Sequence, residues 1–237
     1  MMILASFVFE WIYVIYPVIL FILFVGIRVI LNKMRQKTDL ELQRLLYQLN
    51  NLYLYNELLD NPRLGLLFTK TEREFLRLNG YMTLGKDDDI KKQFKMLSSL
   101  KLRPRLALDL YHKELTYYID TQKYDLALIS YNNLRSILVK QKKEQAKKLL
   151  EEADLIVQIY IHKDISLMPL LLDKAEKTEH MLIKGVLYYR LAKLSYFAKK
   201  NKDVDLYLKR AEPLLKKTTY EPIIKSAFKD YHILNIK

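Results

Sequence analysis

The pattern of hydrophobic and polar positions divides the chain into a short apolar segment and a long amphipathic one. Residues 11–31 read WIYVIYPVILFILFVGIRVIL, and Arg28 is the one charged side chain in this run. At about 1.5 Å per helical residue, a run of this length covers the roughly 30 Å hydrocarbon core of a bilayer. The run therefore predicts an uncleaved transmembrane helix. A cleavable signal peptide is the first alternative, but it needs a basic start and a small-residue cleavage site, which this sequence lacks. A buried core helix is the second alternative, but the run is too long and too uniformly apolar for such a helix.

The charges on either side of this run predict its orientation. Glu10 is the only charge before it, whereas Arg28, Lys33, Arg35 and Lys37 lie at its end. Basic residues stay on the cytoplasmic side of a membrane. We therefore expect a single-pass protein of the cell membrane with its N-terminus outside. Residues 1–37 would form the anchor and basic juxtamembrane segment, and residues 38–237 a cytoplasmic domain.

Helical periodicity runs through almost all of the remaining sequence. Apolar residues recur every three or four positions, and no stretch combines sustained alternation with hairpin-turn residues, so no sheet is predicted. One amphipathic helix is expected over about Asp39–Asp60, and a last one from about Pro222. Between them the pattern predicts four pairs of helices, over residues 71–101, 106–140, 143–177 and 180–217.

Aromatic and small residues recur at matching positions in these pairs. The second pair is the clearest, with Tyr111, Leu115, Tyr118, Ala127 and Tyr131; the position of Ala127 is taken by Ile90, Met168 and Val204 in the other three. These positions resemble those of tetratricopeptide (TPR) repeats, in which small residues let two helices cross closely and larger ones fill the space around the crossing. The resemblance covers residues 63–217. It implies an all-α fold, a single N-terminal transmembrane helix followed by a TPR-like α-solenoid of about four helical hairpins with flanking helices. A generic helical bundle or a related hairpin solenoid is the alternative.

Composition adds a basic balance and excludes thiol chemistry. The chain has 40 Lys and Arg against 27 Asp and Glu, a net charge of +13, and no cysteine. Disulfides, thiol catalysis and Cys-based zinc sites are therefore excluded. A basic surface would attract anionic lipid, nucleic acid or acidic proteins, although a general richness in lysine accounts for much of the charge. The run KQKKEQAKK at residues 140–148 could likewise bind lipid headgroups, RNA or an acidic partner. The simpler interpretation is a solvated junction between two helices.

Residues with catalytic potential are scattered. The four histidines, at 112, 162, 180 and 232, lie far apart, and the chain has no phosphate loop, nucleophile elbow or zinc motif. The Asp87–Asp89 cluster fits a helix start better than a metal site. Without the fold or interleaved aromatics of a nucleic-acid module, nucleic acid is an unlikely partner. We expect no enzyme, no cofactor and no metal.

The TPR resemblance also implies where a partner would bind. In such repeats the first helix of each unit lines a concave groove that accepts a peptide or partner helix. Carried over to this sequence, the groove residues are Phe75, Asn79, Met82, His112, Thr116, Tyr189, Lys193 and Tyr196. Phe75 stands where some members of the family carry a basic residue for a terminal carboxylate, so that specificity is not implied. The sequence thus predicts a membrane-anchored scaffold or adaptor that binds other proteins or peptides; the alternative is a membrane-tethered regulator that senses a peptide or binds RNA.

Overall fold

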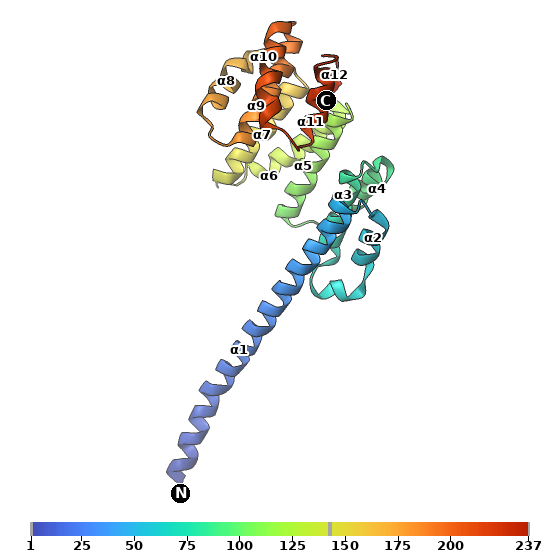
Figure 1. Cartoon of the computed structure of the whole chain (residues 1–237). Helices are drawn as coiled ribbons and strands as arrows, with labels where there is room; N and C mark the ends of the chain where they lie inside the picture. Colours follow the sequence, from blue (N-terminus) through green and yellow to red (C-terminus); the bar gives the residue numbers. More distant parts are fainter. Residues whose placement is uncertain (1, 142–143, 237) are drawn as a thin grey trace. The chain divides into compact units, whose positions relative to one another are not determined.

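The chain forms two compact units that are described separately. The computed structural model describes residues 2–141 and 144–236, and the side chains of residues 16–141 and 144–235. The N-terminal unit is Met1–Lys101 and the C-terminal unit is Leu102–Lys237 (Figure 1). The predicted boundary near residue 38 does not coincide with the boundary between the units. Lys142 and Lys143 of the predicted basic run lie outside the described part.

Helix α1 (Met2–Gln43) is long and apolar enough to cross a membrane. The side chains of residues 16–30 are all exposed, as expected for a helix that has no protein neighbour there. Pro17 lies inside this helix, and transmembrane helices tolerate proline because neighbouring groups satisfy the freed carbonyl. The helix does not stop where the apolar run ends. It continues to Gln43 and then into the π-helical turn η1 (Arg44–Gln48).

This continuation shows that the single helix expected over Asp39–Asp60 is wrong. The chain leaves η1, passes through Asn50 with φ of 48°, and starts α2 (Leu52–Asp60) with the Asn51 side chain accepting a hydrogen bond from the Leu54 backbone N–H. The 3₁₀ turn η2 (Pro62–Leu66), α3 (Lys70–Thr83) and α4 (Asp87–Ser98) complete the N-terminal unit. Apolar residues of α1, η1 and α2 form one of its buried clusters: Leu42, Leu45, Leu46, Tyr55 and Leu59.

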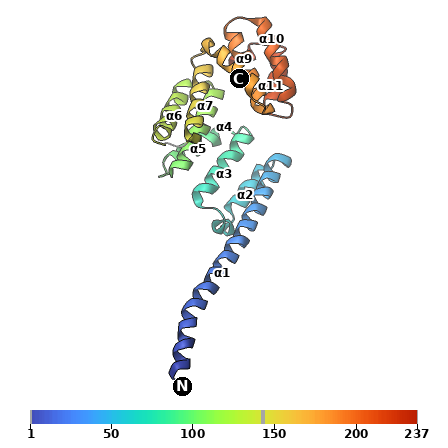
Figure 2. The ribbon, with the colours of Figure 1, turned by 90° about the vertical axis from the view of Figure 1, so that its left-hand side faces the viewer.

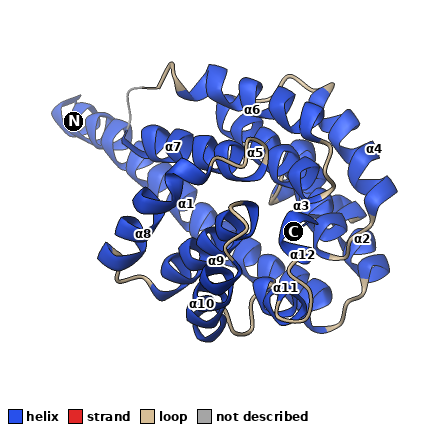
Figure 3. Ribbon diagram, turned by 90° about the horizontal axis from the view of Figure 1, so that it is seen from above, coloured by secondary structure: helices blue, strands red, loops and turns tan. Residues whose placement is uncertain are grey.

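The C-terminal unit contains the remaining helices. They are α5 (Pro104–Asp120), α6 (Tyr124–Leu138), α7 (Glu144–Tyr160), α8 (Met168–Lys177), α9 (Met181–Phe197), α10 (Asn201–Ala211), α11 (Tyr220–Ala227) and α12 (Ile233–Ile236), with short 3₁₀ turns η3 (Ile165–Leu167) and η4 (Glu212–Leu214). Helices α9 and α10 lie side by side (Figure 2). Within the described ranges 2–141 and 144–236 there is no strand (Figure 3), so the all-α prediction is confirmed.

Three helical pairs turn in the same way. In α3–α4, α5–α6 and α9–α10 the first helix ends two residues before a left-handed residue, which is Gly85, Gln122 and Lys199 respectively. The residue after it donates its backbone N–H to a carbonyl five residues back, as Lys86 does to Tyr81, at 2.9 Å. This is the hydrogen bond of a Schellman C-cap, which prefers glycine but here has glycine only once. The shared turn is a structural repeat that residue identity conceals.

The third predicted pair is wrong. Helix α7 packs against α6, while α8 packs against α9, so α7 and α8 do not form a hairpin of their own. Leu171 and Ala175 of α8 are fully buried in the cluster around α9. The predicted last helix is also interrupted, because α11 ends at Ala227 and α12 begins only at Ile233.

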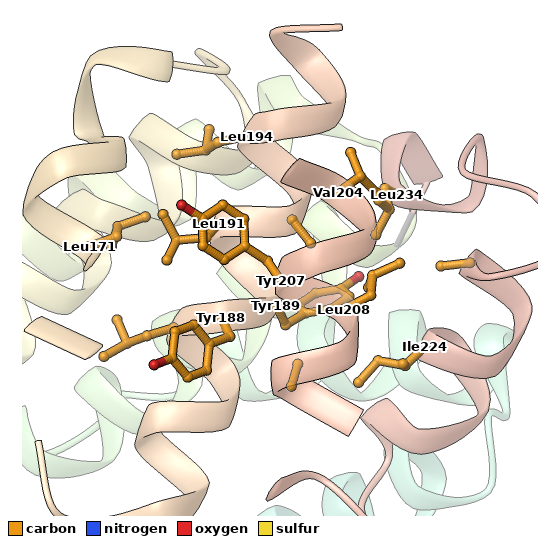
Figure 4. Close-up of a cluster of buried hydrophobic side chains, with 14 of the residues drawn as sticks. Leu171, Tyr188, Tyr189, Leu191, Leu194, Val204, Tyr207, Leu208, Ile224 and Leu234 are labelled. Carbon is orange, nitrogen blue, oxygen red and sulfur yellow. The ribbon is translucent and has the colours of Figure 1, made fainter. Parts of the chain in front are cut away.

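Helix α9 is the centre of the C-terminal unit. Nearly all its residues from Gly185 to Ser195 are buried, and α8, α10, η4 and α12 pack around it. Figure 4 shows Tyr188, Tyr189, Leu191 and Leu194 of this helix among Leu171, Val204, Tyr207, Leu208, Ile224 and Leu234 from its neighbours. A helix that is covered on all sides buries its polar residues too, and these need partners.

Candidate functional site

A pocket of about 330 Å³ opens in the C-terminal unit between four helices. It is lined by Thr116, Ile119 and Asp120 of α5, Ile156 and Tyr160 of α7, Arg190 of α9, and Thr219, Tyr220 and Ile223 at the start of α11. Its volume lies at the lower end of the range for ligand sites, which suits one or two side chains of a partner better than a large cofactor. The lining combines aromatic rings, hydroxyl groups and two charged residues. This mixture can hold a polar group and exclude water around it.

Close packing on α9 positions Arg190, one of the two charged residues of the pocket. Gly185, one and a half turns before Arg190, lies against η4 and the residue after it; a Cβ there would be 2.7 Å from Leu215 Cγ. Only glycine permits this approach without a shift of the neighbouring leucines. The chain that follows Leu215 leads directly into Thr219 and α11, which close one side of the pocket.

Arg190 is the most unusual residue of the pocket. It is 6% exposed, and its guanidinium forms an ion pair with Glu152 of α7. Burial is the largest single influence and disfavours the charged form, but the hydrogen bond to Glu152 and the electrostatic influence of Tyr160, Glu152 and Tyr220 together outweigh it. They raise the pKa of Arg190, so the group is a permanent cation. Its Nε–H has no acceptor among the described residues. Leaving a buried donor unsatisfied costs about 1–3 kcal/mol, more for a charged group, so an acceptor that entered the pocket would be stabilised.

Two tyrosines line the pocket with this cation, and a third packs against one of them. Tyr160 and Tyr220 line the pocket, and Tyr189 lies behind them with its ring edge-on to Tyr220, at a centroid distance of 5.1 Å. Burial raises the pKa of all three phenols, so they are neutral donors at physiological pH. The hydroxyl of Tyr189 is buried without a partner in the described part of the chain. The pocket therefore offers several hydrogen-bond donors and one guanidinium, together with the carboxylate of Asp120.

Lys193, one turn after Tyr189, lies next to the pocket and has a structural role. It is 2% exposed, its Nζ donates to the Leu234 carbonyl at 2.5 Å, and it lies 4.7 Å from the Tyr160 ring centroid and 5.7 Å from that of Phe197. Burial lowers the pKa of its ammonium to about 7. This lysine ties α12 to α9 and does not line the pocket.

The predicted groove residues of the C-terminal unit are only partly brought together. Thr116 lines the pocket, and its hydroxyl donates to the His112 carbonyl at 3.1 Å. His112 is half-buried, and burial lowers the pKa of its imidazole. Tyr196 is half-buried beside His232, 3.3 Å from its Nδ1. Tyr189 is fully buried, so the prediction that its ring projects freely into a groove is wrong; the ring belongs to the core around α9.

Phe75, Asn79 and Met82 lie in the N-terminal unit. Phe75 is buried, which excludes it as an exposed anchor, and Met82 is half-buried. Asn79 lines a small pocket of about 160 Å³ whose other walls come largely from α1 and η1. The end of α1 therefore covers part of the α3 face that the sequence predicts as an open groove.

The acidic cluster lies where the helix dipole favours it. Asp87, Asp88 and Asp89 occupy the first turn of α4, and Lys91 lies 3.2 Å from Asp87 and 3.6 Å from Asp88. Across residues 16–141 and 144–235, no group of three or more His, Asp or Glu side chains is arranged to hold a metal ion. The residues that sequence reasoning missed are Arg190, Tyr160 and Tyr220. An arginine within GVLYYRLAKL was the available signal, since a cation in such an apolar stretch is costly unless paired.

Comparison of the chain with protein-family models, with curated proteins and with solved structures finds no match.

Proposed function

We propose that this chain is a membrane-anchored binding protein whose C-terminal pocket accepts an acidic side chain of a partner protein. The observation that carries this proposal is the buried Nε–H of Arg190, which lacks an acceptor in a pocket large enough for a side chain. Tyr160, Tyr220 and Thr219 would supply further donors and the rings that exclude water. A carboxylate is the group that best uses a guanidinium and hydroxyl donors together. The proposal includes no catalytic step.

The anchor is part of the same proposal. A helix that is long and apolar enough to cross a membrane, with exposed side chains over residues 16–30, supports it. The basic residues Arg28, Lys33, Arg35 and Lys37 favour a cytoplasmic location for the two units, with the N-terminus outside. A reporter fused after Lys237 should be active only in the cytoplasm. Activity of that fusion on the outer side would contradict the orientation.

A degenerate TPR-like arrangement is the architecture that we propose for the hairpins. Its support is the common turn geometry of α3–α4, α5–α6 and α9–α10 and the complete burial of Ala127 and Val204 at the predicted helix crossings. Only these three pairs enter the proposal, because α8 packs against α9.

Blocking the mouth of the pocket tests the binding proposal. Thr219 is exposed at its edge, so Thr219→Trp should fill the opening without disturbing the core. Ser226→Trp is the matched control, since Ser226 is also exposed on α11 but does not line the pocket. The full chain in nanodiscs would be screened against a displayed peptide library. We expect enrichment of Asp or Glu at one position, which Thr219→Trp abolishes and Ser226→Trp preserves. Enrichment without acidic residues, or enrichment that survives Thr219→Trp, contradicts the proposal.

A further inference from the structure

The connection between α2 and α3 is held beside α1 just after the apolar run ends. The Arg35 guanidinium lies 4.7 Å from the centroid of the Phe68 ring, and its terminal nitrogen lies 2.9 Å from Glu72 Oε1. Arg35 follows Leu31, the last residue of the apolar run, by four positions, or about 6 Å along a helix. Figure 1 shows this connection at the end of the N-terminal unit that faces the N-terminal part of α1. If α1 spans a bilayer, the connection lies at the level of the lipid headgroups.

This connection has a fixed shape and an exposed apolar residue. Asn61 accepts the backbone N–H of Arg63 at 2.9 Å, Pro62 starts η2, and the side chains of Leu64 and Phe68 are buried in the unit. These anchors leave Leu66 pointing outward with 77% of its surface exposed, the largest exposed fraction among the large hydrophobic residues of the described part. An exposed leucine on an ordered turn has a cost in water that a lipid surface removes.

Exposed basic residues flank Leu66 in the sequence and also lie on the part of α1 that includes Arg35. Lys33 and Lys37 on α1, Arg63 on η2 and Lys70 at the start of α3 are all exposed. Each basic side chain close to an anionic membrane surface contributes about 1 kcal/mol of attraction. An exposed leucine flanked in the sequence by basic residues is complementary to a surface of acyl chains beneath a layer of phosphates.

We propose that residues 62–70 form a second membrane contact, in which Leu66 inserts into the leaflet where α1 ends while Arg63 and Lys70 bind the phosphates of anionic lipids. The contact would fix the N-terminal unit against the bilayer rather than leave it free on a single helix. The inference rests on the proposed span of α1 and is independent of the pocket in the C-terminal unit.

Tryptophan scanning tests the contact, because Trp11 is the only tryptophan in the chain. In a Trp11→Phe background, Leu66→Trp reports on the connection and Phe24→Trp on the middle of the predicted span. Tyr53→Trp is the matched control: Tyr53 is 76% exposed in the same unit, but it opens α2 beyond η1. Gln48 lies about 20 Å beyond Arg35 along α1 and η1, so Tyr53 is held away from the bilayer. Each full-length variant would be reconstituted in vesicles of equal parts phosphatidylcholine and phosphatidylserine with brominated acyl chains.

We expect strong quenching at position 24, and at position 66 a blue-shifted emission with quenching several-fold stronger than at position 53. Adding Arg63→Glu and Lys70→Glu to the Leu66→Trp variant should reduce the quenching at position 66 in these vesicles, but not in vesicles of phosphatidylcholine alone. Equal quenching at positions 66 and 53, with position 24 quenched, overturns the second contact and leaves the span intact. Absence of quenching at position 24 overturns the span and the contact together. If the quenching at position 66 is unchanged by the charge reversal, the proposed role of the lipid phosphates is overturned.

Discussion

The buried Lys193 makes the stability of the C-terminal unit depend on pH in a way that one substitution removes. Its ammonium is 2% exposed between the Tyr160 and Phe197 rings, with Asp120 and Lys163 as the charged groups that influence it. Burial is the largest influence and lowers its pKa to about 7. In the unfolded chain the pKa of a lysine is about 10.4.

The sign follows from the protons held in each state. Below pH 7 both states hold the proton, so the contribution of Lys193 to stability does not change with pH. Between pH 7 and about 10.4 the unfolded state holds a proton that the folded state has released, so stability rises with pH. The slope approaches about 1.4 kcal/mol per pH unit, which gives about 2–3 kcal/mol between pH 7 and pH 9. Lys193→Met keeps most of the volume and removes the titration.

Urea unfolding of the full chain in nanodiscs, followed by circular dichroism at both pH values, measures this effect. The free energy of unfolding of the wild type should rise relative to that of Lys193→Met by about 2–3 kcal/mol from pH 7 to pH 9. Lys202→Met, which changes an exposed lysine of α10, should leave the slope of the wild type unaltered. Loss of the hydrogen bond to Leu234 shifts the variant equally at both pH values and does not affect the comparison. Parallel pH profiles for wild type and Lys193→Met would refute the reasoning.

Three further predictions use the same unfolding assay. Lys199→Gly should raise the free energy of unfolding by about 1 kcal/mol, because glycine adopts the left-handed φ of 57° without strain. Gly85→Ala should lower the free energy of unfolding by a similar amount for the same reason. Effects of the same sign at both positions would contradict the shared turn. Gly185→Ala should cost about 1–3 kcal/mol, since its Cβ would meet Leu215 at 2.7 Å, and a gain in stability would show that the leucine moves freely. Tyr189→Phe should be neutral or stabilising, because the hydroxyl has no partner among the described residues. Tyr189→Ala should lower the free energy of unfolding by about 3–5 kcal/mol. A large loss of stability in Tyr189→Phe would show that the hydroxyl does have a hydrogen-bond partner.

Hydrophobic periodicity predicts well where the helices of this chain lie in the sequence, but poorly which helices pack against one another. The pairs α3–α4, α5–α6 and α9–α10 are predicted correctly because each is joined by a tight turn, which leaves the second helix only one place to pack. The segment between α7 and α8 is longer and includes η3, and Lys163 has a φ of 53° there. Leu171 and Ala175 give α8 an apolar face, but their spacing does not say which helix covers it. In the structure, α9 is the helix that covers this face of α8.

The extent of α1 was not predictable from hydropathy either. The apolar run ends at Leu31, and polar residues follow, so hydropathy alone predicts an end there. The backbone of a helix does not require apolar side chains, and Leu42, Leu45 and Leu46 bury the far end of the same helix in the N-terminal unit. One continuous helical element therefore joins the apolar run to the folded part of the N-terminal unit.

The candidate site could not be found by position within a repeat, and the reason lies in α11 and α12. In an open solenoid the inner face of α9 would be free, and Tyr189 would be available to a partner. Here α12 packs against α9, Ile224, Ala227 and Leu234 join its core, and Lys193 bonds the Leu234 carbonyl. The C-terminal helices thus occupy the space in which the repeat resemblance expects a ligand. The opening that they leave is the pocket at Arg190, whose walls come from helices far apart in the sequence. An arginine that is costly to bury and incompletely bonded is therefore a better guide to the site than the aromatic residues of the repeat pattern.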